Sequence, residues 1–224
     1  MTDTVPAALQ AVFERERADA RRAVAGDADA VRAQVIRMYS RIEREQAAVI
    51  AVVKPLLACK LGCNYCCHQR VELRPYEAFV LAEHIRSRLT AARQANARQR
   101  LAAIREQVAS LTAQQHTQAG IPCALLEDGV CSIYEGRPAT CRKYYSVSVE
   151  TCRNAFNDTS APLTGQIEDE QVRLAGNAVA LGYAKGLEDA GYDATLYELH
   201  DAVYRALTNS KAEKRYRDGK KPFV

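Results

Sequence analysis

Apolar side chains recur at alternating steps of four and three residues from Val31 to Leu56. This spacing is typical of a long helix with one apolar seam, as in coiled coils. A weaker stripe lies upstream and ends at Gly26, a residue suited to end a helix. The pattern therefore predicts an antiparallel helical hairpin over residues 1–58.

Helical periodicity returns beyond residue 70. Pro75 is suited to a first helical position and opens a predicted helix to about Leu89. Further helices are expected over residues 101–111, 172–187 and 196–207. Residues 90–100 contain neither glycine nor proline, so the pattern does not place the break within them. We expect a surface loop over residues 154–165.

From residue 121 onward, short apolar runs flank the turn signal Glu127-Asp128-Gly129, which predicts a small β-hairpin. A three-residue loop with Gly129 in the left-handed conformation would place Cys123 and Cys131 on one face, whereas a two-residue loop would place them on opposite faces. Binding of one metal by both thiols favours the three-residue loop. Pro138 is then expected to open a short helical turn that presents Cys141.

Together these elements predict a mainly α protein: a helical hairpin or bundle with a small cysteine-rich, metal-binding β-hairpin segment. Three regions follow along the chain: an N-terminal helical hairpin (1–58), a cysteine-cluster region with a helical insertion (59–152), and C-terminal helices with a basic tail (153–224). We expect them to pack as one compact domain, because 48% of the 224 residues are apolar, enough for a real core.

The net charge of +4 arises mostly from acidic and basic residues mixed along helices, as on solvated faces. The exception is the stretch 211–221, where six basic residues oppose two acidic ones. We expect a solvated, frayed end there, and nucleic acid is disfavoured because no aromatic side chains for base stacking accompany the charge. The helical seam and this basic tail are the surfaces on which a protein partner is conceivable.

No apolar stretch near the N-terminus suits a signal peptide, and the longest apolar run, Ala47 to Val53, is too short to cross a bilayer. We therefore expect a cytoplasmic protein with no membrane segment. Cytosolic thiols are kept reduced, so clustered cysteines there indicate metal binding or catalysis rather than disulfides.

Four of the eight cysteines lie within nine residues. The full set is Cys59, Cys63, Cys66, Cys67, Cys123, Cys131, Cys141 and Cys152. Cys63-x-x-Cys66 can supply two metal ligands from one turn, and Cys59 lies one helical turn before Cys63. The adjacent side chains of Cys66 and Cys67 diverge, so one of them is expected to face a second metal, a second iron or the core.

Two arrangements are compatible with the spacing of these thiols. Each group of four could form its own centre, or the upstream turn and the downstream segment could share one. The shared centre better explains why 55 residues of mainly helical sequence separate Cys67 from Cys123.

Four thiolates around Zn²⁺ or a doubly charged [4Fe–4S] core leave a net charge near about −2, which needs compensation when buried. Basic side chains flank the cysteines: Lys60, Arg70, Arg137, Arg142 and Lys143. His68 follows Cys67 directly and is a candidate for cofactor binding, as a ligand or as a hydrogen-bond donor, although beside so many thiols a residue without a role at the metal is favoured over a ligand. The other histidines fall on predicted helices without ligand partners at suitable spacing and are expected to be structural: His84, His116 and His200.

The run from Cys59 to Cys67, Cys-Lys-Leu-Gly-Cys-Asn-Tyr-Cys-Cys, and the segment from Cys123 to Arg142, with its Arg-Pro-Ala-Thr-Cys motif, resemble the YkgJ-type cysteine-cluster family. That family is described as zinc- or iron-chelating and is similar to the metal-binding region of the flagellin lysine N-methylases. Over about residues 56–152 the resemblance implies chelation by all the cysteines except Cys152, supported by Tyr134, Arg137 and Pro138. Cys152 is added because it closes the segment.

The thiol count, the adjacent cysteine pair and the Arg-Pro-x-x-Cys motif favour a [4Fe–4S] cluster or iron over a lone zinc ion, with a redox or, less favoured, a methyl-transfer role. One alternative is a structural zinc protein that serves as a partner-binding module. Another is metal storage or delivery. No paired carboxylates, phosphate-binding loop or serine-based triad stands out, so no substrate or catalytic residue is predicted.

Overall fold

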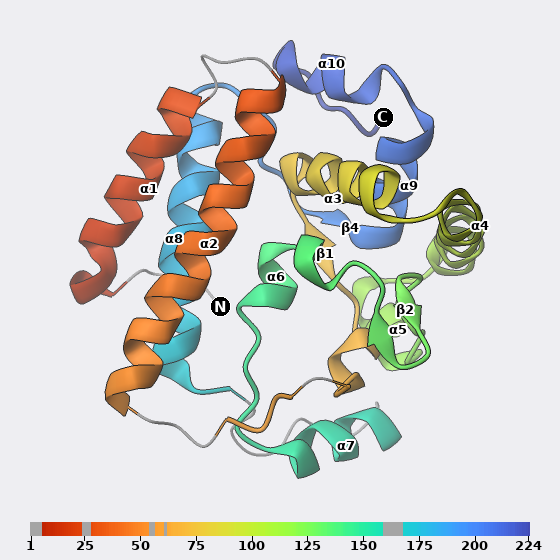
Figure 1. Cartoon of the computed structure of the whole chain (residues 1–224), viewed down its shortest axis with the longest axis horizontal. Coiled ribbons are helices and arrows are strands. Elements are labelled where there is room, and N and C mark those ends of the chain that lie inside the picture. The colour runs from red at the N-terminus through yellow and green to blue at the C-terminus, as the bar shows by residue number, and fades with distance from the viewer. Residues whose placement is uncertain (1–5, 24–27, 54–56, 61, 159–167) are drawn as a thin grey trace.

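Three long helices lie side by side in the computed structural model, which describes residues 6–23, 28–53, 57–60, 62–158 and 168–224 (Figure 1). They are α1 (Gln10–Ala23), α2 (Ala28–Val53) and α8 (Glu170–Asp189), and the short 3₁₀ helix η1 (Ala7–Leu9) precedes α1. The predicted seam of α2 is buried at Val35, Met38 and Ile42, whereas Val52 is 81% exposed. Consequently the seam ends before the last turns of the helix.

Helix α1 packs chiefly on α8 rather than on α2, so the N-terminal hairpin is completed by a helix from the far end of the chain. Two glycines one turn apart on α8, Gly182 and Gly186, make this close approach possible. A Cβ atom at either position would collide with a backbone carbonyl oxygen of α1, that of Phe13 or that of Arg17.

A second group of helices forms the other half of the molecule (Figure 1). It contains α3 (Pro75–Arg88), α4 (Ala91–Val108), α5 (Ala113–Gln118), α9 (Leu199–Thr208) and α10 (Ala212–Arg217). The break between α3 and α4 falls at Leu89, and Thr90 caps α4 by accepting a hydrogen bond from the Arg93 amide at 3.4 Å. Strand β1 (Glu72–Leu73) pairs antiparallel with β4 (Tyr197–Glu198) and ties the start of α3 to the start of α9.

The predicted β-hairpin is present as β2 (Leu126–Glu127) and β3 (Val130–Cys131), but the expected three-residue loop is wrong. Glu127 pairs with Val130, so the loop is the two residues Asp128 and Gly129, both with positive φ (50° and 77°) as such tight turns require. Cys123 still reaches the same region as Cys131, because it precedes the strand in a turn closed by the Leu126 amide on the Cys123 carbonyl at 3.0 Å.

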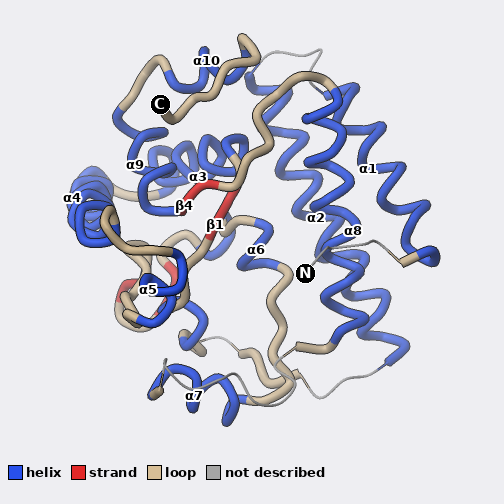
Figure 2. The backbone as a smooth tube through the Cα atoms, turned by 180° about the vertical axis from the view of Figure 1, so that it is seen from behind, coloured by secondary structure: helices blue, strands red, loops and turns tan. Residues whose placement is uncertain are grey.

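Short helical segments complete the cysteine region: η2 (Tyr65–His68), η3 (Tyr134–Gly136), α6 (Ala139–Arg142) and α7 (Val149–Asn157). The expectation of a short turn that begins after Pro138 and carries Cys141 is confirmed. The loop expected from residue 154 is wrong up to Asn157, which belongs to α7; residues 159–165 of that loop lie outside the described residues. Figure 2 shows that the chain between α6 and α7 is a long loop.

The basic C-terminal tail is folded rather than frayed. Tyr216 and Phe223 are 2% and 8% exposed. Their rings lie 5.7 and 5.6 Å from that of Phe79 on α3. Apolar packing therefore holds this end of the chain against the core, while the lysines and arginines between these rings remain toward solvent.

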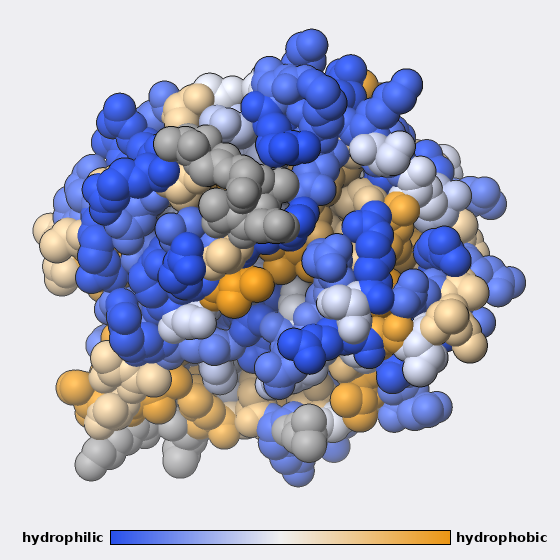
Figure 3. All heavy atoms as spheres, turned by 45° about the horizontal axis from the view of Figure 1, so that its top comes forward, coloured by the Kyte–Doolittle hydropathy of each residue, from blue (hydrophilic) through white to orange (hydrophobic). Residues whose placement is uncertain are grey.

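One hydrophobic core runs through all three sequence regions, from Ala20 to Phe223. The mainly α fold class is confirmed. In the described part of the chain, no helix combines the length and the apolar character needed to cross a membrane. Figure 3 shows a face of the molecule that is mostly hydrophilic, with smaller hydrophobic patches between the polar side chains.

The substitution Gly186→Ala tests the close contact between α1 and α8. Alanine at a helix interior normally stabilises by about 1 kcal/mol relative to glycine. Here we expect the opposite sign, a loss of about 1–3 kcal/mol in the free energy of unfolding, because the added methyl group meets the Arg17 carbonyl. Urea denaturation followed by circular dichroism measures this difference.

Gly176→Ala on the same helix is the matched control. Its Cβ would lie 3.0 Å from Gln46 Nε2 and Lys143 Cβ, which is a milder contact than that of Gly186 and involves side-chain atoms rather than backbone. A stabilising effect of Gly186→Ala, or an equal loss for both variants, contradicts the proposed backbone contact.

Candidate metal centre

Two cysteine segments far apart in the sequence are held together by backbone hydrogen bonds. The Cys123 amide donates to the Cys67 carbonyl at 2.8 Å, and the Asn64 side chain donates to the Gly129 carbonyl in the hairpin turn at 3.4 Å. On the other side, the Ala58 amide donates to the Ser146 carbonyl at 2.8 Å. The cysteine turn of residues 58–67 is thus hydrogen-bonded on one side to the β-hairpin segment and on the other to the loop that follows α6.

An inner thiol group consists of Cys66, Cys67, Cys123, Cys131 and Cys141. Burial raises the pKa of Cys141 well above its usual range, and repulsion from the thiolates of Cys123, Cys66 and Cys131 raises it further. The pKa of Cys131 is also raised, first by burial and then by Cys123. Thiols from η2, the hairpin and α6 therefore influence one another directly.

A hydrogen bond between Cys66 and Cys67 lowers the pKa of one thiol and raises that of the other. The Cys67 thiol donates to the Cys66 sulfur, and this bond lowers the pKa of Cys66 to about 7, helped by the positive charge of Arg137. The same bond, together with burial, raises the pKa of Cys67. One of the two adjacent sulfurs is therefore poised as a thiolate near neutral pH, the form that binds metals.

An outer thiol group consists of Cys59, Cys63 and Cys152, with Ser146 at its centre. The Ser146 amide donates to the Cys59 sulfur at 3.1 Å, and the Cys152 thiol donates to the Ser146 hydroxyl at 3.0 Å. Burial raises the pKa of Cys59, and repulsion from Cys63, Cys66 and Cys152 adds to this rise. Since Cys66 influences both groups, the outer group adjoins the inner one.

Arg137 supplies the positive charge that a cluster of thiolates needs. Its Nε is buried and has no hydrogen-bond partner among the described residues. The guanidinium lies over the Tyr134 ring, 3.9 Å from its centroid, and its charge favours the thiolate forms of Cys66, Cys131 and Cys141. A cationic side chain whose buried Nε has no hydrogen-bond partner in the described chain, beside clustered thiols, fits an anionic metal–thiolate centre.

Arg142 has a different set of contacts. Its Nε donates to the Arg137 carbonyl at 2.7 Å, and its other nitrogens bind the Glu135 carbonyl and the Glu43 carboxylate. The guanidinium also lies 4.5 Å from the centroid of the Tyr39 ring. Arg142 therefore holds the Glu135–Arg137 backbone against α2, and its link to the thiols runs through Arg137.

His68 contacts a backbone carbonyl and an aromatic ring. Its Nδ1 lies 3.2 Å from the Asn64 carbonyl oxygen, and its ring packs edge-on against Phe156 of α7 with 4.7 Å between centroids. The Tyr65 ring lies 5.6 Å from the same phenylalanine. Both side chains thus dock α7 onto η2.

Two of the histidines expected to be structural meet a carboxylate instead. His116, Glu198 and His200 offer ligand atoms that all lie within 4.8 Å of one another. Sequence reasoning missed this group because His116 is 84 residues from His200 and no spacing rule joins them; the only local signal is Glu198-x-His200. The cysteines of the described chain are gathered more loosely than this, so a bound metal would draw their sulfurs together.

Fold and thiols together define a helical protein with a cysteine cluster built from two distant segments. Residues 58–162 match the family model CxxCxxCC, described as a "Putative zinc- or iron-chelating domain", which confirms the resemblance to a cysteine-cluster family. Metal binding through this region is thereby supported. Searches of the curated proteins and of the solved structures found no match.

The lowered pKa of Cys66 predicts selective alkylation in the metal-free protein. Iodoacetamide should modify Cys66 first, with a rate that rises through about pH 7 and levels off above it, because only the thiolate reacts. Peptide mass spectrometry across a pH series measures the rate at each cysteine. Cys67→Ala removes the hydrogen-bond donor and should move the midpoint upward. A wild-type midpoint at the ordinary thiol value of about 8.5 would contradict the prediction.

Proposed function

We propose that this protein holds an iron–sulfur cluster of the [4Fe–4S] type on its inner thiol group and serves a redox function. The observation that carries the proposal is the convergence of thiols from η2, the hairpin and α6 beside the Arg137 guanidinium, whose buried Nε has no hydrogen-bond partner in the described chain. Thiolates are the usual ligands of such clusters, and the family match gives iron as one of two metals. When bound, the cluster would supply one-electron transfer.

The surrounding residues suit an anionic cluster. Four thiolates around a doubly charged cluster leave a net charge of about −2, which Arg137 partly compensates. Amide hydrogen bonds to sulfur, like that from the Ile133 amide to Cys131, stabilise such negative charge. Cys66 is exposed, so the centre lies near the surface, where a partner protein could exchange electrons with it.

The outer thiol group has a supporting role in this proposal. Cys59, Cys63 and Cys152 would bind a second metal ion or pass iron inward through Cys66, which adjoins both groups. A reducing compartment such as the cytoplasm is the setting that the proposal requires, because all eight cysteines are free thiols.

Structural zinc is the second candidate. The cysteine-bearing segments have little regular structure of their own: both strands of the hairpin contain two residues and α6 contains four. Segments of this kind are commonly held by a metal ion whose binding energy is part of the folding energy. In that case the protein would serve as a zinc-dependent scaffold.

Metal analysis of protein purified without oxygen separates the two candidates. We expect a brown protein that contains iron and acid-labile sulfide. Cys141→Ser, in the inner group, should lose most of both, whereas the matched outer variant Cys152→Ser should keep them. A colourless protein loaded with zinc would contradict the cluster proposal. Equal loss of iron in Cys141→Ser and Cys152→Ser would contradict the assignment of the cluster to the inner thiol group.

Substitution of Arg137 tests charge compensation at the centre. Arg137→Gln should weaken metal retention against a chelator by about tenfold or more, as other losses of supporting residues do, and lower the reduction potential of the centre. Arg137→Lys keeps the positive charge and should stay closer to wild type in potential. Voltammetry and chelator competition measure the two effects, and identical potentials in all three proteins would show that the charge is not felt by the metal.

A further inference from the structure

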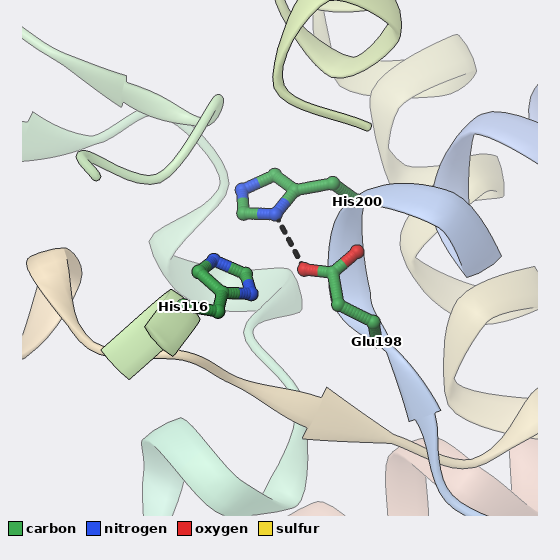
Figure 4. A group of neighbouring side chains, drawn as sticks. All are labelled: His116, Glu198 and His200. Carbon is green, nitrogen blue, oxygen red and sulfur yellow. Dashed lines mark hydrogen bonds and ion pairs between the residues drawn. The ribbon is translucent and has the colours of Figure 1, made fainter. Parts of the chain in front are cut away.

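A second group of metal-ligand side chains lies outside the cysteines, between α5, β4 and α9 (Figure 4). His116 comes from α5, Glu198 from the end of β4, and His200 from the first turn of α9. Figure 4 shows the three side chains pointing toward one another. We propose that they form a separate binding site for a divalent first-row transition-metal ion of the Zn²⁺ class.

The donor atoms are already close to the geometry that such an ion needs. All three ligand atoms lie within 4.8 Å of one another, and His116 and His200 are each only 3% exposed. Zinc binds imidazole nitrogen and carboxylate oxygen at about 2.0–2.2 Å, so small side-chain rotations would bring the donors onto one ion. Two histidines and one glutamate are an established ligand set for zinc with one open position.

Hydrogen bonds fix the turn that carries Glu198 and His200, and these two side chains also bond to each other. Glu198 Oε2 accepts a hydrogen bond from the Asp201 amide at 2.9 Å and so caps α9, while Oε1 faces His200 Nδ1 at 2.6 Å. The Leu199 amide donates to the Val71 carbonyl at 3.0 Å, which anchors the same turn to the chain before β1. An ion would take the place of the proton between Glu198 and His200.

His116 is positioned by the start of its own short helix. The Gln115 amide donates to Thr112 Oγ1 at 3.2 Å, and the Thr112 amide donates back to Gln115 Oε1 at 2.9 Å, a reciprocal cap. The His116 ring centroid lies 6.2 Å from that of His200. The third ligand is therefore held opposite the Glu198–His200 pair by a defined helix end.

The ring of His200 also faces the thiol region on its other side. Its Nε2 accepts a hydrogen bond from the Ala124 amide at 3.3 Å and also lies within hydrogen-bonding reach of the Cys123 sulfur. A metal-bound imidazole usually donates its other N–H to an acceptor, and with the ion on Nδ1 the Cys123 sulfur is the acceptor next to Nε2. The new site is thus distinct from the thiols in its donors but adjacent to them in space.

Metal stoichiometry tests the site on the full-length protein with its thiol centre in place. Zn²⁺ is added in equilibrium dialysis, and bound zinc and iron are counted together. We expect wild type to bind one more equivalent of zinc than His116→Gln, with iron unchanged. His84→Gln, a histidine on α3, is the matched control and should bind zinc like wild type. Equal zinc binding by wild type and His116→Gln would overturn the proposal.

Two further experiments test the site: a second variant, which serves even if His116→Gln does not fold, and cobalt spectroscopy. Glu198→Gln keeps an oxygen for the cap of α9 but removes the carboxylate, and should also lose the extra equivalent. With Co²⁺ in place of Zn²⁺, the difference between the wild-type and His116→Gln spectra should contain weak visible bands without the intense sulfur charge-transfer band of thiolate-bound cobalt. A spectrum with only the sulfur band would contradict the site. Wild-type protein without iron would count against the cluster proposal, whereas wild-type protein that holds iron but binds no more zinc than His116→Gln would count against this one.

Discussion

The buried carboxylate of Glu77 joins the elements that carry the thiol site. It is 3% exposed, and it accepts hydrogen bonds from the Ala139 amide at 2.7 Å, the Arg74 amide at 3.1 Å and the Tyr39 hydroxyl at 3.4 Å. A buried charge is stable only when its hydrogen bonds are satisfied, so this residue fixes α2, α3 and α6 relative to one another. The segment with Cys141 is thereby anchored to the helical core.

Positive charge is distributed around this anchor in two layers. Arg142 stacks on the Tyr39 ring and holds the Glu135–Arg137 backbone, and Arg137 then extends toward the thiols without a hydrogen-bond partner for its Nε in the described chain. The helical core therefore satisfies one arginine fully and leaves the next for the cysteine region. That arrangement makes the thiol region electrostatically favourable for an anionic group even before a metal is present.

Local sequence patterns predicted most helices, because helical periodicity depends on near neighbours. A shared centre for the two cysteine segments rests on another argument, the 55 residues of mainly helical sequence between Cys67 and Cys123, and stays a prediction. Local patterns gave wrong predictions where contacts between residues far apart in the sequence determine the conformation. The hairpin loop is shorter than expected because Asp128 accepts a positive φ, and the basic tail is folded because Tyr216 and Phe223 pack on Phe79. His116 and His200 were dismissed because their proximity depends on the docking of α9, through the pairing of β4 with β1, which no local pattern reveals.

The position of His200 between Glu198 and Cys123 has a consequence for both proposed centres. Burial alone would lower the pKa of this imidazole, but its hydrogen bonds with Cys123 and Glu198 raise that pKa to about 9. The His200 ring therefore interacts with negative charge on Glu198 at one side and on Cys123 at the other. A metal on the thiols withdraws charge from Cys123, and a metal at Glu198 displaces a proton from the ring, so occupancy of either site changes the electrostatic environment of the other. Two centres that share one imidazole are thermodynamically linked, whatever metals they hold.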